Sequence, residues 1–290
     1  MMLEARYEFD AIGTKWAIDT EAELTDSEKS AIAAYIESFD RAYSRFRNDS
    51  LVHALAESPG VSFTFPPNVT DILDIYDTLN ELSEGKINPL AGGSLEALGY
   101  DAQYSLRASR PLPAPNYRTT LVRNEISLSV NAPAILDIGA IGKGYLVDAL
   151  AAIVAKTHNS FVVDGSGDIA VCGDNIQRIG LEHPSDPSKA IGVVTVQNAS
   201  LCGSGIGKRV WGKGLHHIID ATTGLPTTST IIATWTIAPN TVLADALTTG
   251  LFFIEPAQLR EKFGNFDYVI MHNDGRVVHN LRPETGELFI

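Results

Sequence analysis

The order of predicted helices and strands is the sequence feature that most constrains the fold. Apolar and charged residues alternate over Leu3–Asp10, which predicts a half-buried strand, and several helices follow it. After residue 115 the pattern becomes rich in strands, and helices do not separate these strands regularly. A doubly wound fold requires that regular alternation. We therefore expect an α+β fold with a mixed, largely antiparallel sheet packed with helices.

Local signals place the individual elements. Thr25 and Glu28 form a predicted capping box, and Ser50 offers a second helix cap. The predicted helices after the first two cover Val69–Leu82, Lys143–Lys156, Val242–Phe252 and Ala257–Phe263. The predicted strands are Thr119–Arg123, Ile126–Val130, Ile135–Ile138, Phe161–Val163, Ile169–Cys172, Gly192–Gln197, His217–Ile219 and Ile231–Ile237, and Asn273–Gly275 predicts a hairpin turn. We expect one domain over residues 1–290, with two α/β subdomains as an open alternative.

Composition and charge exclude several classes of protein. The 290 residues are 44% hydrophobic, and the formal net charge is −13. The apolar content argues against disorder, and the excess of carboxylates argues against binding to nucleic acid or to a membrane surface. Charged residues interrupt the first 19 positions, so we expect no secretion signal. We therefore expect a cytoplasmic protein in which Cys172 and Cys202 are reduced thiols.

A glycine-rich segment, Asp137–Gly144, follows a predicted strand and opens a predicted helix. A helix N-terminus presents free N–H groups to an anion, and Lys143 adds a positive charge beside them. The segment matches neither the P-loop nor the dinucleotide-binding glycine pattern. A glycine-rich turn that binds no ligand remains an equal alternative at this point.

Three further segments carry polar groups of interest. Asp164–Asp168 predicts a tight turn between two strands, for which a plain β-turn is the favoured interpretation. Asp245 and Thr249 lie four residues apart on a predicted helix and project from one face, as oxygen ligands of Mg²⁺ or Ca²⁺ could. An amphipathic helix without a metal explains that spacing equally well. His216 and His217 would point to opposite faces of a strand.

These motifs, taken in order, resemble those of the ApbE family, the FAD:protein FMN transferases. The resemblance rests on Asp137-Ile-Gly-Ala-Ile-Gly-Lys-Gly144, Gly167-Asp168, Ser204-Gly205, His217-Ile-Ile-Asp220 and Ala244-Asp-Ala-Leu-Thr-Thr249. Ile12-Gly-Thr14, Ser44–Ser50, Gly85–Pro89 and Leu98–Tyr100 extend it over residues 9 to 283. The sequence departs from the family pattern where Asn88 replaces an Asp, Phe46 a Tyr and Leu98 a Trp.

The resemblance implies an activity and a set of site residues. The family transfers the FMN half of FAD to a Thr or Ser hydroxyl of an acceptor protein, releases AMP and requires Mg²⁺. The family's FAD contacts fall on Ile12, Phe46, Lys86, Ile87, Asn88, Asp137 and Lys143. Its metal ligands fall on the carbonyl of Ala140 and on Asp245 and Thr249. The implied partners are FAD and the acceptor protein.

The base that accepts the hydroxyl proton is less well defined. His217 stands at the family's His position, and imidazole titrates near neutral pH. The alternative is that His217 only binds FAD, in which case Asp168 or a metal-bound acceptor would take the proton. Two other functions stay open, a Mg²⁺-dependent FAD pyrophosphatase that yields FMN and AMP, and a non-catalytic FAD-binding protein.

Overall fold

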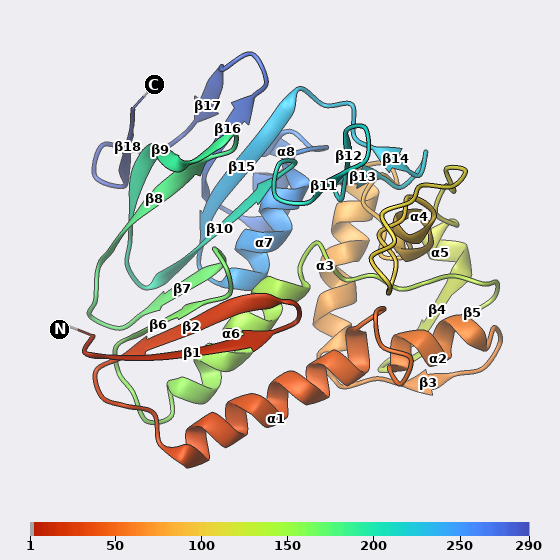
Figure 1. Ribbon diagram of the computed structural model, residues 1–290, viewed down its shortest axis with the longest axis horizontal. Helices are drawn as coiled ribbons and strands as arrows, with labels where there is room; N and C mark the ends of the chain where they lie inside the picture. Colours follow the sequence, from red (N-terminus) through yellow and green to blue (C-terminus); the bar gives the residue numbers. More distant parts are fainter. Residues whose placement is uncertain (1–2, 290) are drawn as a thin grey trace. The chain divides into compact units, whose positions relative to one another are not determined.

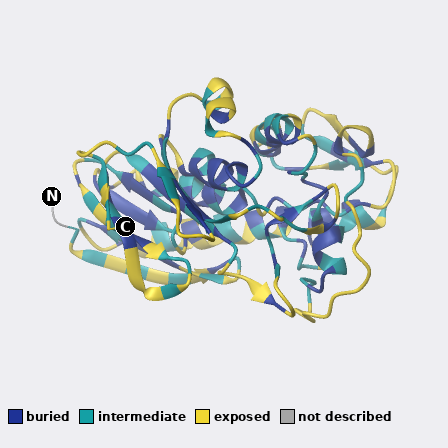
Figure 2. Cartoon of the chain, turned by 90° about the horizontal axis from the view of Figure 1, so that it is seen from above, coloured by how far each residue is buried: buried dark blue, intermediate teal, exposed yellow. Residues whose placement is uncertain are grey.

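The computed structural model describes residues 3–289, which form two compact units. Unit 1 comprises the chain up to Ile36, Ala140–Lys208 and the chain from Ser229 onward. Unit 2 comprises Glu37–Gly139 and Arg209–Thr228. Within each unit the buried residues gather along the strands and the inner faces of helices, and most exposed residues lie in loops (Figure 2).

Unit 1 contains an eight-stranded sheet in which all neighbouring strands are antiparallel (Figure 1). Its strands in spatial order are β1 (Ala5–Ala11), β2 (Thr14–Thr20), β6 (Phe161–Asp164), β7 (Ile169–Cys172), β10 (Ala199–Gly205), β15 (Ile231–Ala238), β16 (Asp267–His272) and β17 (Val277–His279). The predicted α+β class with a largely antiparallel sheet is therefore confirmed. The turn between β1 and β2 is formed by Ile12 and Gly13, whose φ angles of 43° and 76° are both left-handed.

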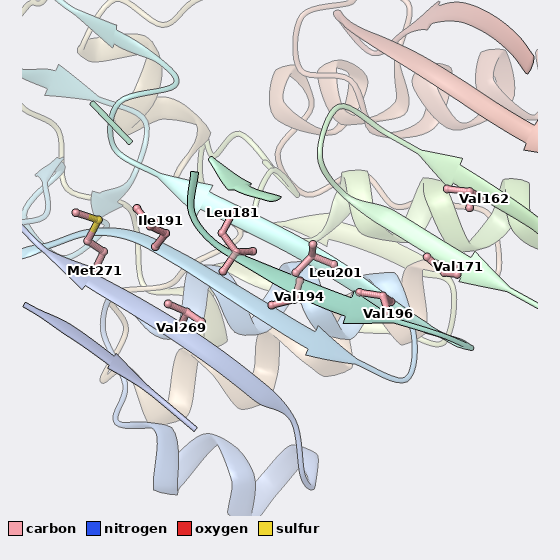
Figure 3. Packing of buried hydrophobic residues seen from close by; sticks show 9 residues of the cluster. All are labelled: Val162, Val171, Leu181, Ile191, Val194, Val196, Leu201, Val269 and Met271. Atoms are coloured by element: carbon pink, nitrogen blue, oxygen red, sulfur yellow. The ribbon is translucent and has the colours of Figure 1, made fainter. Parts of the chain in front are cut away.

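A smaller antiparallel sheet packs on the large one in unit 1. Its strands are β8 (Gln177–His183), β9 (Asp186–Val196) and β18 (Gly286–Leu288). Buried side chains from both sheets meet in one cluster (Figure 3). Val162, Val171, Leu201, Val269 and Met271 come from the large sheet, and Leu181, Ile191, Val194 and Val196 come from the small one. Burial of this apolar surface holds the two layers together.

The helices of unit 1 include two that position the candidate site, α6 (Gly142–Val154) and α7 (Thr241–Gly250), which lie side by side (Figure 1). The other helices are α1 (Asp26–Tyr43), whose last residues belong to unit 2, and α8 (Pro256–Phe263). The Thr25 capping box is present, because Glu28 accepts from the N–H of Thr25 at 2.7 Å and donates its own N–H to the Thr25 hydroxyl. No helix within residues 3–289 is long and apolar enough to cross a membrane.

Hydroxyl groups join α7 to the sheet. Ser200 and Ser204 on β10 bond to the hydroxyls of Thr241 and Thr248 at 2.8 and 2.9 Å. From β15, Thr234 and Thr236 donate to the carbonyls of Thr248 and Ala244 at 2.8 and 2.7 Å. All six hydroxyl-bearing side chains except Ser204 are buried. A buried hydroxyl without a partner is costly, so these matched pairs fix how α7 sits on the sheet.

Helix α6 holds α7 at two points. Asp148 accepts the free N–H groups of Thr241 and Val242 at the start of α7, both at 2.8 Å. Gly144 lies so close to α7 that a Cβ built on it would come within 2.4 Å of the Thr241 carbonyl and 2.6 Å of the Asp245 Cβ. Glycine is therefore required at position 144 by close approach of the two backbones.

Unit 2 combines short helices with small sheets. Its helices are α2 (Leu51–Glu57), α3 (Val69–Leu82), α4 (Gly92–Ala97) and α5 (Tyr117–Thr120). Its strands are β3 (Phe63–Thr64), β4 (Leu121–Asn124), β5 (Ser127–Val130), β11 (Val210–Trp211), β12 (Leu215–His216), β13 (Ile219–Asp220) and β14 (Leu225–Pro226). The predicted cap at Ser50, the helix over 69–82 and the hairpin after residue 119 are confirmed.

Two predicted strands are wrong, and each contains a candidate site residue, Asp137 in one and His217 in the other. Ile135–Ile138 makes a single bridge, from Ile135 to Ala91, and no ladder. Its apolar side chains pack in the core, since Leu136 and Ile138 are buried. The predicted strand His217–Ile219 is also absent, because β12 ends at His216, a bend follows at His217, and β13 begins at Ile219.

We predict that Gly144→Ala destabilises unit 1. The new methyl group would contact the backbone of α7, which cannot move without breaking its hydrogen bonds to the sheet. Overpacking of this kind costs about 1–3 kcal/mol. Urea unfolding measures the loss, and Gly180→Ala is the matched control, because a Cβ there meets only the Ala190 methyl, at an ordinary 3.6 Å. Equal stability of the two variants would contradict the close approach.

Candidate active site

Lys143 occupies the first turn of α6, as the sequence predicts, and is held by a carboxylate from the neighbouring sheet. Its Nζ lies 3.0 Å from the Oδ2 of Asp168 and donates to the carbonyl of Ser166 at 3.4 Å. Burial lowers the pKa of Lys143, but the carboxylates of Asp168 and Asp245 outweigh that effect and raise it overall. The lysine is therefore a fixed cation at a helix N-terminus, where anions bind favourably.

The turn that carries Asp168 joins β6 to β7. Ser166 and Gly167 adopt left-handed φ angles of 60° and 94°, and the N–H of Gly167 donates to Asp164 at 2.8 Å. The segment is thus the tight β-turn that the sequence predicts. It also does more than turn the chain, because Asp168 at its end is 1% exposed and pairs with Lys143.

Asp245 and Thr249 lie on α7 one helical turn apart. Asp245 is 6% exposed, and its Oδ2 accepts the N–H of Gly144 at 2.9 Å, whereas Thr249 is half-buried. Ala140 lies two residues before α6 in the same unit. A carboxylate, a hydroxyl and a main-chain carbonyl are hard oxygen donors, and Mg²⁺ commonly binds few protein ligands and keeps several waters. The donor chemistry therefore fits Mg²⁺. Within residues 3–289 no group of three or more His, Cys, Asp or Glu side chains is arranged to hold a metal.

Cys202 is a neighbour of this cluster for which the sequence predicts only a reduced thiol. Its Sγ contacts the carbonyl of Thr241 at 3.6 Å, and it is fully buried and free of any disulfide. Burial and the nearby carboxylates of Asp168 and Asp245 raise the pKa of Cys202 well above its usual value. The thiol is therefore protonated and fills space between the charged side chains.

In unit 2, Arg45 organises the carboxylate of Asp137. The Nε of Arg45 donates to Asp137 Oδ2 at 2.6 Å, and its Nη1 donates to the carbonyl of Tyr100 at 2.7 Å. The guanidinium also lies over the ring of Phe46, 4.1 Å from the centroid, and its side chain is 2% exposed. Asp137 Oδ1 in turn accepts the N–H of Gly139 at 2.7 Å. The ion pair thus shapes the turn that leads to Lys143 in the sequence.

His217 lies in the bend between β12 and β13 rather than on a strand. Burial, together with the positive charge of Arg209 and the adjacent His216, lowers the pKa of His217 to about 3. Its Nδ1 is buried and has no hydrogen-bond partner among the described residues. The imidazole is therefore neutral at physiological pH. A pKa this low makes His217 a weaker base than an ordinary histidine, so the expectation that it titrates near neutral pH is wrong.

The remaining predicted FAD contacts occupy loops. Lys86, Ile87 and Asn88 lie between α3 and α4, where the carbonyl of Lys86 accepts from Ala221 at 3.0 Å. The side chain of Asn88 donates to the carbonyl of Pro115 at 3.0 Å and accepts from Leu90 at 2.8 Å, so it fixes the loop.

Within each unit, the structure gathers some of the predicted site residues. In unit 1, Lys143, Asp168 and Asp245 form one polar cluster, and Ile12 is set apart in the β1–β2 turn. In unit 2, Arg45 links Phe46 to Asp137, whose charge also acts on His217.

Sequence reasoning missed Arg45 and Asp148. Arg45 stands inside the motif Ser44–Ser50, but nothing in that motif shows that its partner is Asp137, 92 residues away. Asp148 follows Lys143 on the same helix, and no local signal shows that it caps α7.

Comparison with protein families and curated proteins gives one consistent result. The model of the family described as "ApbE family" matches residues 12–270. A protein of Klebsiella pneumoniae named FAD:protein FMN transferase is 25% identical over 276 residues, which cover 86% of this chain and 78% of that one. A Treponema pallidum protein of the same name is 28% identical over 269 residues, covering 80% of this chain and 73% of that one.

Solved structures show the same fold. The ApbE protein from Thermotoga maritima superposes with a TM-score of 0.82 at 20% identity, covering 95% of this chain and 96% of that one. The flavin transferase ApbE from Vibrio cholerae gives a TM-score of 0.79 at 19% identity, covering 97% of each chain.

We predict that Arg45→Met lowers the free energy of unfolding by about 3 kcal/mol, because removing one partner of a buried ion pair leaves the other charge uncompensated. Urea unfolding measures the change. Arg47→Met is the control, since Arg47 pairs with Glu37, Asp40 and Asp49 near the surface, and loss of such pairs costs about 1 kcal/mol or less. A loss for Arg45→Met no larger than that of the control would contradict this interpretation of the pair.

Proposed function

The chain belongs to the ApbE family, and we propose that it is an FAD:protein FMN transferase. One observation carries the proposal beyond family membership. Lys143, at the N-terminus of α6, is fixed by Asp168 and lies in the field of the buried carboxylate of Asp245. A fixed cation and a helix N-terminus stabilise the charge that develops on a pyrophosphate when it is attacked.

We propose transfer to a Thr or Ser hydroxyl with release of AMP. The hydroxyl oxygen forms a bond to the phosphorus of the FMN half of FAD. The bond from that phosphorus to the bridging oxygen breaks, and the bridging oxygen leaves with AMP. The hydroxyl proton passes to a base, for which His217 is our candidate, because its buried Nδ1 has no hydrogen-bond partner among the described residues. The carboxylate of Asp168 is paired with Lys143. This pairing favours a role for Asp168 in orienting the lysine rather than in accepting the proton.

We propose that Asp245, Thr249 and the carbonyl of Ala140 hold Mg²⁺. The bound ion would neutralise charge on the phosphate oxygens. The protein's own part is to present these donors at a fixed spacing. Asp245 is fixed by the N–H of Gly144, and α7 is fixed on the sheet by its hydroxyl contacts.

Incubation with FAD, Mg²⁺ and a candidate acceptor protein, followed by intact-mass analysis, tests the proposed function. We expect the acceptor to gain the mass of FMN less water and AMP to appear in equal amount. Release of both FMN and AMP without a modified protein would instead identify an FAD pyrophosphatase. Binding of FAD with neither product would leave a carrier protein.

Asp245→Asn should abolish transfer and leave the fold intact. The amide keeps the size of the side chain and can still accept from Gly144, but it removes the only negative charge among the proposed ligands. Transfer rates over a Mg²⁺ titration, with circular dichroism of the variant, measure the effect. Wild-type turnover at saturating Mg²⁺ would show that the metal is held elsewhere.

Lys143→Gln should weaken FAD binding, because the helix N-terminus alone would then face the pyrophosphate. A charge-assisted contact is worth roughly 1.5–3 kcal/mol, or about 10- to 150-fold in the dissociation constant. FAD fluorescence titration measures it. Lys189→Gln, at an exposed lysine of unit 1 that is not a proposed FAD contact, is the control and should leave the dissociation constant unchanged. An unchanged dissociation constant for Lys143→Gln would show that Lys143 does not contact the phosphates.

His217→Ala and His216→Ala separate the two roles open to His217. Loss of a general base should lower kcat by roughly 10²- to 10⁴-fold and leave the dissociation constant of FAD nearly unchanged. His216 is buried on the adjacent β12 and should leave kcat near the wild-type value. A raised dissociation constant with normal kcat for His217→Ala would assign it to FAD binding alone.

A further inference from the structure

Unit 2 carries a cluster of basic side chains in a chain whose carboxylates outnumber its basic groups 35 to 22. Arg107 and Arg110 lie in the loop of residues 101–115, and Arg209 and Lys213 lie in the segment 209–214. All four are exposed, and none forms an ion pair within residues 3–289. We call these four residues the basic patch. The two segments together contain one acidic residue, Asp101, which is bonded to Ser105 within the loop.

The two segments are neighbours within unit 2. The ring of Tyr100, next to the loop, stacks on Trp211 with centroids 5.5 Å apart, and the Arg209 guanidinium lies 5.9 Å from the Tyr100 centroid. The indole of Trp211 donates to the carbonyl of Leu98 at 2.7 Å. The loop and strands β11–β14 lie at the same end of unit 2 (Figure 1).

Large apolar side chains are exposed among the basic ones. Tyr104, Leu106 and Leu112 on the loop are 53%, 46% and 53% exposed, and Val210 on β11 is 56% exposed. Such groups scattered singly need no explanation, but gathered beside unpaired arginines they have the composition of a protein-binding surface. Arginine and tyrosine are the residues that most often dominate binding energy at such surfaces.

The loop is held in place rather than left to move freely. Leu106 and Ser109 donate backbone N–H groups to the carbonyls of Gly99 and Ala97 at 2.8 and 2.7 Å. Tyr104 and Leu106 keep left-handed φ angles of 49° and 53°, which bulky residues rarely adopt. A fixed loop presents its side chains to a partner without an ordering cost at the moment of binding.

We propose that the basic patch and its apolar neighbours are the docking surface for the acceptor protein, and that they recognise an acidic segment with apolar residues beside the modified hydroxyl. This proposal rests on the proposed function. The net charge of −13 repels acidic partners elsewhere on the chain, so complementary charge at the patch would orient the acceptor as well as attract it. The same net charge disfavours nucleic acid and anionic membranes, which need many more basic contacts.

The test measures binding of two fluorescein-labelled peptides to the FAD-saturated protein by anisotropy. One peptide alternates Asp and Glu with Leu and Val around a single Thr, and the other has Lys in place of every acidic residue. The patch variant is Arg107→Glu with Arg110→Glu. The control, Arg178→Glu with Arg282→Glu, makes the same change in net charge at exposed sites of unit 1.

We expect the wild-type protein to bind the acidic peptide at least tenfold more tightly than the basic one, and less tightly as salt is raised. The patch variant should lose that binding at least tenfold, and the control should keep it. Equal binding by the patch variant and the wild type, or no binding by the wild type, would overturn the proposal. Phosphatidylglycerol vesicles that bind where the acidic peptide does not would overturn it in favour of a membrane surface.

Two further measurements separate this proposal from the proposed function. The dissociation constant of FAD should be the same in all three proteins, and a weaker value in the patch variant alone would assign the patch to FAD and overturn the docking surface. If the wild-type protein binds the acidic peptide as expected but transfers no FMN to any acceptor, the proposed function fails, and the basic patch stands as a docking surface for an acidic partner that is not flavinylated.

Discussion

The close contact between α6 and α7 is the constraint on which the candidate site depends. Gly144 allows the two backbones to touch, and its N–H then fixes the carboxylate of Asp245. Lys143 directly precedes that glycine, so the same contact fixes the position of the Lys143 backbone. Asp148, one helical turn after Gly144 on α6, accepts the N–H groups of Thr241 and Val242 at the start of α7. Helix propensity contributes little to the positions of these charged groups, because packing between the two helices decides them.

Each buried charge in the polar cluster of unit 1 lies beside a group that stabilises it. Lys143 contacts Asp168, Asp245 accepts a backbone N–H, and Cys202 among them remains neutral because burial and the carboxylates raise the pKa of its thiol. Unpaired burial of any of these groups would be expensive. A lysine paired in this way keeps its charge and its position before a substrate arrives, and preorganisation of that kind is what electrostatic catalysis requires.

The sequence predicts the parts of the fold that depend on local chemistry. The capping box at Thr25, the cap at Ser50 and the alternation in β1 each depend on neighbouring residues, and all three are present. Ile135–Ile138 has strand composition but no strand neighbours, because its apolar residues fill a core instead of a ladder. The candidate site likewise has a part that local motifs indicate and a part that depends on contacts between distant positions. Lys143, Asp168 and Asp245 stand in motifs that the sequence displays, but the Arg45–Asp137 pair joins positions whose proximity only the fold reveals.

The hydroxyl groups that join α7 to the sheet have a consequence for mechanical freedom. At an apolar interface only the shape of the interlocking side chains resists sliding of a helix, since dispersion attraction is non-directional. Directional bonds between Ser200 and Thr241, and between Thr234 and the Thr248 carbonyl, permit only one register. Any displacement along the helix axis would leave several buried donors unpaired at once. Helix α7 therefore has a single position on the sheet in which all of these bonds are made.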